Sequence, residues 1–206
     1  MRHYSKPGES SGTEHFFTVT DSLKLFANDP LLFEPGTKYS YTTYGFSVLG
    51  CAIETVSGMA YGDYMRTRVF EPAGMTHTSL DDVYLVLPQR ARGYFMLDQG
   101  SFDQLPPAAK RIAKVGGIYN APLHDTSMKM PGGGLLSTPA DLMAFATALF
   151  DGRLLKPASL KAMWTSQRTT DGTLTDYGLG WGVGNNPGRL IVSHGGNQAG
   201  ASSLFM

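Results

Sequence analysis

Hydrophobic positions recur at helical spacing between residues 44 and 57. The residues that repeat along one face are Tyr44, Val48, Cys51, Ala52, Ile53 and Val56. This spacing predicts an amphipathic helix, and Gly58 provides its C-terminal stop. Thr43 carries the hydroxyl expected of an N-cap residue. The preceding loop opens with a Pro35-Gly36 turn, so its side chains are predicted to be held against a buried helix.

The same periodicity predicts further helices. A short helix opens at Thr20-Asp21, another covers residues 61–69, and a third covers 155–164. The clearest start signal is Thr138, a predicted N-cap before a proline at the first helical position and an acidic residue in the first turn. The apolar stripe that follows ends at Gly152, which closes this helix.

From residue 177 onward the pattern changes to strands. Bulky residues alternate with glycine over 177–183, a turn follows at 185–188, and 189–193 and 202–206 are the next two strands. We expect residues 80–130 to form a long excursion over the surface, with a strand at 90–95. Helices followed by antiparallel strands favour an α+β fold. We expect one domain over 1–206, with a mainly helical lobe up to about residue 131 and a helix pair with sheet strands after it.

Composition narrows the function classes. The 206 residues carry 17 basic and 17 acidic side chains without a basic run, which argues against nucleic-acid binding. The single cysteine, Cys51, excludes an intrachain disulfide and falls in the predicted apolar face. No apolar run approaches the ~18 residues of a membrane-spanning helix, and no signal-peptide pattern is present. Compartment and oligomeric state stay open.

Two stretches carry side chains suited to catalysis. Tyr41 lies in the loop before the 44–57 helix, which can hold a phenol rigidly, although packing in an aromatic cluster is the commoner role. His194 precedes Gly195 and Gly196 at the end of the second predicted strand. A histidine can exchange a proton near neutral pH, and an uncovered backbone beside it can stabilise an oxyanion. An exposed turn histidine is an equally good interpretation.

Other chemistries find less support. The remaining histidines show no metal-ligand spacing, so neither a metal nor another cofactor is expected. They are His3, His15, His77 and His124. The glycine run at 132–134 lacks the Lys-Ser/Thr of a phosphate loop, and no Gly-x-Ser-x-Gly motif occurs.

Seven short sequence blocks follow one another along the chain at residues 35–43, 57–58, 72–78, 91–94, 133–142, 177–181 and 194–196. Together and in this order they resemble the motifs of the serine β-lactamase and penicillin-binding-protein-like superfamily, in its class C, D,D-peptidase and esterase branch. Within it the chain is similar to the mitochondrial serine β-lactamase-like proteins and their bacterial relatives, through Arg2-His3-Tyr4, residues 22–30 and Tyr-x-Thr at 41–43. The resemblance implies a β-lactamase/transpeptidase-like fold and acyl-enzyme hydrolysis of small esters, amides or peptides.

The resemblance also implies residue roles. Tyr41 relays a proton between nucleophile and leaving group. His194 stands where many members carry lysine, and the loss of a permanent charge disfavours binding of a β-lactam carboxylate. Thr43 replaces an asparagine that contacts the substrate amide, and Asn197 contributes a backbone N–H to the oxyanion hole. The implied substrate-binding residues are Thr43, Gly195, Gly196 and Asn197.

One family motif is missing. The superfamily's nucleophile lies in Ser-x-x-Lys, which occurs nowhere in the 206 residues. Thr126-Ser-Met-Lys129 imitates it on a predicted loop, and we interpret it as a chance match. We therefore expect an internal fragment, truncated at both ends and inactive alone because no nucleophile is available. Two alternatives stay open: a non-catalytic binding or assembly module, and a β-lactamase or D,D-peptidase acting on β-lactams and D-amino-acid peptides.

Overall fold

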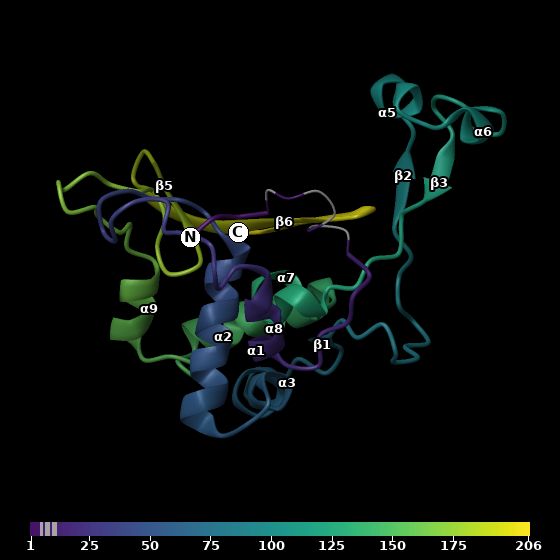
Figure 1. Cartoon of the computed structure of the whole chain (residues 1–206). Helices are drawn as coiled ribbons and strands as arrows, with labels where there is room; N and C mark the ends of the chain where they lie inside the picture. Colours follow the sequence, from purple (N-terminus) through teal and green to yellow (C-terminus); the bar gives the residue numbers. More distant parts are fainter. Residues whose placement is uncertain (5, 7–8, 10–11) are drawn as a thin grey trace.

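The computed structural model describes residues 1–4, 6, 9 and 12–206 of the chain. Figure 1 shows a body of helices beneath a small sheet, and an arm that projects away from both. The helices precede the main antiparallel sheet, and two short antiparallel strand pairs lie among them, which confirms the α+β prediction. Among the described residues, no helix is long and apolar enough to span a bilayer.

Helix α2 (Thr43–Ser57) ends as predicted, at Gly58 with a φ of 68°. Its start differs from the prediction, because Thr42 is the N-cap residue and Thr43 is the first helical residue. The Thr42 hydroxyl donates to the carbonyl oxygen of Arg2 instead of capping the helix. The N-terminal segment of the chain therefore replaces the expected side-chain cap.

The buried face of α2 also differs from the predicted apolar stripe. Val56 is 89% exposed and Cys51 is half-buried, whereas Ser47 and Gly50 are buried. The reason is the short helix α7 (Met130–Gly133), which packs very closely against α2. A Cβ atom at Gly50 would lie 2.4 Å from Pro131 Cγ, so only small side chains fit between the two helices.

The first helix, α1 (Val19–Ser22), starts one residue before its predicted position and continues into η2 (Leu23–Leu25). Its N-cap is Thr18, which forms a reciprocal capping box with Asp21. The predicted helix at 61–69 continues to residue 73 as α3 (Tyr61–Met65), η3 (Arg66–Phe70) and α4 (Glu71–Ala73). One core cluster packs the segments that flank α1 and η2 against the start of α2, and it consists of Phe16, Phe26, Tyr44 and Met128.

Helix α8 (Pro139–Phe150) is preceded by Thr138, whose side chain accepts from the Asp141 N–H, so the predicted cap is confirmed. Asp141 is buried and accepts from the His77 N–H and the Thr78 hydroxyl. These bonds tie the turn at 72–78 to α8, next to the short pair β1 (Ser79–Leu80) and β4 (Leu135–Leu136). Helix α9 (Pro157–Met163) follows and packs Leu160 against Trp181.

The main sheet has the order β5-β6-β7 and is antiparallel. Its strands are β5 (Gly182–Asn186), β6 (Arg189–Gln198) and β7 (Ala201–Phe205). The strand predicted at 177–183 is wrong over most of its length, because Asp176 and Gly180 have φ values of 53° and 87° and form turns. Strand β6 runs five residues past its predicted end, and β7 matches the third predicted strand.

The excursion predicted at 80–130 contains the projecting arm (Figure 1). Strands β2 (Tyr94–Met96) and β3 (Ile118–Asn120) pair antiparallel and carry α5 (Gln99–Asp103) and α6 (Pro107–Lys110). At its root, a Cβ atom on Gly200 would lie 2.7 Å from the Gly93 carbonyl carbon. The arm is thus anchored on the turn between β6 and β7, and the chain re-enters the body through η4 (Ser127–Lys129) and α7.

Candidate active site

Tyr41 and His194 lie close together, although 152 residues separate them in the chain. Their ring centroids are 6.0 Å apart. Tyr41 comes from the loop before α2 and is partly exposed, and His194 comes from the middle of β6 rather than from the strand end predicted for it. The fold therefore brings the two candidate acid–base side chains to one place.

Tyr177 joins this pair and was not identified as a site residue from the sequence. Its hydroxyl oxygen lies 2.9 Å from His194 Nε2, and its ring centroid is 6.1 Å from that of Tyr41. Burial raises the pKa of Tyr177, and the neighbouring Tyr41 and Tyr39 add to the rise. The hydroxyl therefore keeps its proton at neutral pH and can donate it to an unprotonated Nε2. The only sequence signal was its place in the Tyr-Gly-x-Gly-Trp block.

His3 borders the same cluster from the N-terminal segment. Its ring lies 4.2 Å from Tyr4 and 5.5 Å from Tyr41, measured between centroids. Burial lowers the pKa of His3, and the positive charge of Lys129 lowers it further. Its Nδ1 accepts from the N–H of Thr43 at 3.2 Å, which requires that nitrogen to be unprotonated. Arg2 fixes the segment through ion pairs to Glu9 and Asp29.

Thr43 is buried at the start of α2, where its methyl group lies close to Gly132. A Cβ atom on Gly132 would come within 2.4 Å of Thr43 Cγ2. The structure thus places Thr43 two residues from Tyr41 but beneath the surface that Tyr41 reaches. A contact between Thr43 and substrate remains a prediction.

Gly195, Gly196 and Asn197 lie within β6 and pair with Leu204, Ser203 and Ser202 of β7. On its other edge β6 pairs with β5 only as far as Ser193, which is opposite Gly182. Among the described strands, the segment from His194 to Gln198 therefore has a neighbour on one edge only. An edge of this kind offers backbone N–H groups to a ligand, as the oxyanion-hole prediction for Asn197 requires.

Lys129 is a buried cation next to this edge, only 5% exposed. Its Nζ donates to Gln198 Oε1 at 2.8 Å, and Gln198 Nε2 donates to the Gly133 carbonyl oxygen. Burial lowers the pKa of Lys129, and the charge of Asp81 acts against that shift. These bonds hold the end of β6 against α7, directly after Asn197.

The segment Thr126–Lys129 is not the loop that the sequence predicted, because η4 is buried in the body. The Thr126 hydroxyl donates to the Asp81 carbonyl oxygen at 3.2 Å, whereas the Lys129 amine donates to Gln198. The two side chains that imitate Ser-x-x-Lys therefore have different partners. Within the described part of the chain, no group of three or more His, Cys, Asp or Glu side chains is arranged to hold a metal ion.

Comparison with known proteins agrees with this architecture. The family model described as beta-lactamase matches residues 2–206. The human serine beta-lactamase-like protein LACTB, mitochondrial (Homo sapiens) is 31% identical over 98% of this chain and 40% of its own length. Penicillin-binding protein 4* of Bacillus subtilis (strain 168) is 30% identical over 93% of this chain and 44% of its own length.

Solved structures give the same fold. The penicillin-binding protein from Bacillus halodurans superposes with a TM-score of 0.71 at 24% identity, over 96% of this chain and 57% of that one. D-amino acid amidase from Ochrobactrum anthropi SV3, complexed with D-phenylalanine, gives 0.70 at 24% identity, over 92% of this chain and 53% of that one. The chain thus spans about two fifths of the curated relatives and a little over half of these solved structures. With a family model that matches nearly every residue, the chain belongs to the beta-lactamase family.

Proposed function

We propose that this chain supplies the proton-transfer and substrate-binding part of a serine-hydrolase active site that works through an acyl-enzyme. The observation that carries the proposal is the 6.0 Å separation of the Tyr41 and His194 rings, brought together from a loop and a strand far apart in sequence. The family is one of β-lactamase-like hydrolases, which supports the reaction class.

In the proposed reaction a serine oxygen bonds to the acyl carbon of the substrate. As the Tyr41 oxygen accepts the serine proton, the Tyr41 hydroxyl passes its own proton to the leaving alcohol or amine. Water later attacks the acyl-enzyme, gives a proton back along the same path and releases the acid. The backbone N–H of Asn197 stabilises the oxyanion of each tetrahedral intermediate, and His194 with Tyr177 borders the path of the proton.

We assign the substrates to small esters, amides or peptides. The names of the relatives support this class, because they include a D-amino acid amidase and penicillin-binding proteins. Histidine at position 194 lacks the permanent charge of lysine, so the electrostatic attraction for a β-lactam carboxylate is weaker there. β-Lactams are therefore the weaker candidates within this class.

The 206 residues contain no Ser-x-x-Lys, so the proposal takes the nucleophile from outside this sequence. A fluorophosphonate probe followed by intact-mass analysis tests this directly. We expect no adduct on the 206-residue chain and one adduct on a serine of the gene product that carries a Ser-x-x-Lys segment. A labelled serine within the 206 residues would contradict the assignment of the nucleophile. No adduct on either protein would favour the alternative of a non-catalytic binding or assembly module.

A further inference from the structure

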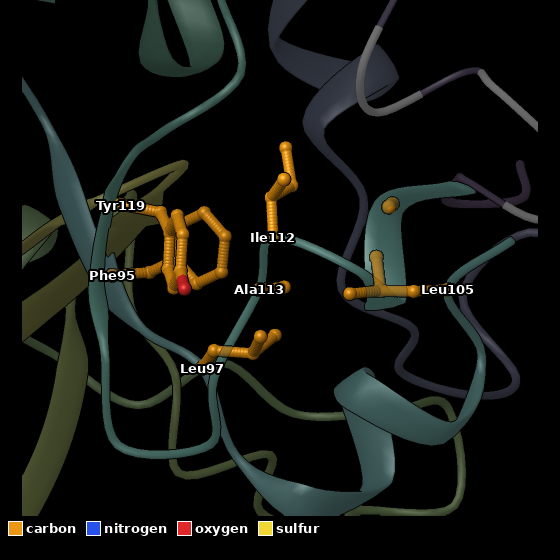
Figure 2. A pocket seen from close by; sticks show the side chains of 7 residues that line it. Phe95, Leu97, Leu105, Ile112, Ala113 and Tyr119 are labelled. Atoms are coloured by element: carbon orange, nitrogen blue, oxygen red, sulfur yellow. The ribbon is translucent and has the colours of Figure 1, made fainter. Parts of the chain in front are cut away.

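The projecting arm carries apolar side chains on its outside as well as its inside. Its interior is a cavity of about 180 Å³, lined only by apolar and aromatic residues. Figure 2 shows Phe95 and Tyr119 along one side of this cavity, opposite Leu105, with Ile112 between them. Ile112 is nevertheless 83% exposed, so it reaches from the cavity wall to the surface of the arm.

The second face of the β2–β3 hairpin is also uncovered. Tyr94 and Met96 point away from Phe95 because alternate residues of a strand face opposite sides, and Met96 pairs with Ile118. Ile118 is 76% exposed, and Tyr94, Met96 and Val115 are exposed as well. An exposed apolar surface of this kind on a projecting element indicates an interaction site.

Basic side chains alternate with these apolar residues along 110–115. Lys110, Arg111 and Lys114 flank Ile112 and Val115, and Arg111 and Lys114 are exposed. The two acidic groups of the arm, Asp98 and Asp103, stay ionised but lie at α5, outside 110–115, where Asp98 accepts from the Ser101 N–H and Asp103 from the Gln99 amide. The surface around Ile112 and Val115 is therefore both apolar and positively charged.

We propose that the arm docks on the surface of an anionic lipid bilayer. Arg111 and Lys114 would face lipid phosphates while Ile112 and Val115 enter the boundary of the acyl chains, as in other peripheral membrane elements. Charge favours this occupant over a second copy of the chain, because a symmetric contact would set these cations against themselves. The proposal rests on the arm alone and does not depend on the proposed hydrolase function.

The test is flotation of the 206-residue chain with vesicles of phosphatidylcholine alone or mixed with phosphatidylglycerol. We expect binding to the mixed vesicles only. The double variant R111S/K114S should lower the partition coefficient about fivefold for each basic side chain removed. The variant Val115→Ser should lower it about tenfold, because it removes apolar surface without altering the cavity wall.

Two matched variants control for net charge and for surface hydrophobicity. K156S/K161S removes two exposed cations beside and within α9, and Val56→Ser removes an exposed valine at the end of α2, so both should bind like the unmodified chain. Equal partitioning into both kinds of vesicle would overturn the proposal, as would an equal loss in the control variants. The proposal would also be overturned if the chain formed dimers in the absence of vesicles and R111S/K114S or Val115→Ser dissociated them. A second copy of the chain would then cover the arm.

Discussion

The hydroxyl of Tyr177 joins a turn to strand β6 through its hydrogen bond to His194 Nε2. The same ring contacts the rings of Tyr41 and Tyr39, so one half-buried phenol has three partners. His3 has a comparable part on the other side of Tyr41, where its unprotonated Nδ1 accepts from the first N–H of α2. At the scale of single residues, the candidate site is ordered by neutral groups that surround Tyr41 and His194.

Replacing Tyr177 by phenylalanine tests the bond to His194. Tyr177→Phe keeps the ring and removes a partly buried hydrogen bond, so we expect the free energy of unfolding to fall by about 1 kcal/mol. Urea denaturation of the 206-residue chain measures it. The matched control Tyr39→Phe removes a hydroxyl from a more exposed ring in contact with Tyr177, and its denaturation midpoint should not move. Equal losses in the two variants would contradict the assigned role of Tyr177.

The protonation of His3 predicts a dependence of stability on pH. Because the pKa of His3 is lowered in the folded chain, the unfolded chain binds a proton first as the pH falls below about 6.5. The free energy of unfolding should then decrease by up to about 1.4 kcal/mol per pH unit, a loss that is absent at higher pH. His3→Asn should flatten this slope between about pH 6.5 and 5. Parallel curves for the two proteins would rule out His3 as the source.

Sequence reasoning named Tyr41 and His194 as candidate residues, which the structure brings close together, but it missed the groups that hold them. Both were found because they belong to family blocks whose order is visible along the chain. Tyr177 could not be assigned a partner, since its contact depends on how the turn at 176–181 folds onto β6. Lys129 was interpreted as part of a chance match, because nothing in Thr126-Ser-Met-Lys129 indicates that η4 is buried.

Helices α2 and α7 pack with almost no space between them, which decides which face of α2 is buried. The start of α8 was predictable because Thr138, Pro139 and Asp141 act locally within one turn. The buried face of α2 was not, because Ser47 and Gly50 face a neighbour that approaches too closely for Val48 or Val56. Apolar periodicity identifies such a helix, but the close approach of the neighbouring helix determines which of its faces is buried.

A glycine-to-alanine pair tests this close packing. Gly50→Ala places a methyl group 2.4 Å from Pro131 Cγ and 3.0 Å from Val19 Cγ1, so we expect a loss of about 1–3 kcal/mol in the free energy of unfolding. The control Gly100→Ala, in α5, meets its nearest atom at 3.5 Å and should stabilise the chain by about 0.5–1 kcal/mol. Thermal denaturation of both variants decides the matter. A neutral or stabilising Gly50→Ala would disprove the close contact.

At the scale of the whole molecule, the helical body and the sheet each contribute residues to the candidate site. The loop before α2 brings Tyr41 from the body, β6 brings His194 and Asn197 from the sheet, and the β6–β7 turn carries the root of the arm. The α+β class and this pairing followed from the order of family blocks. The lengths of the strands and the ordered arm did not, because they depend on pairings between distant segments.

The central claim is that Tyr41 transfers the proton in a serine-hydrolase site. Its most direct test is the rate of acylation by an activated ester, measured in the gene product that carries this chain together with a Ser-x-x-Lys segment. Tyr41→Phe should lower that rate by about 10²- to 10⁴-fold, because the phenol oxygen that carries the proton is removed. Tyr39→Phe, two residues away, should leave the rate unchanged. Equal acylation rates for Tyr41→Phe and the unmodified protein would contradict the account.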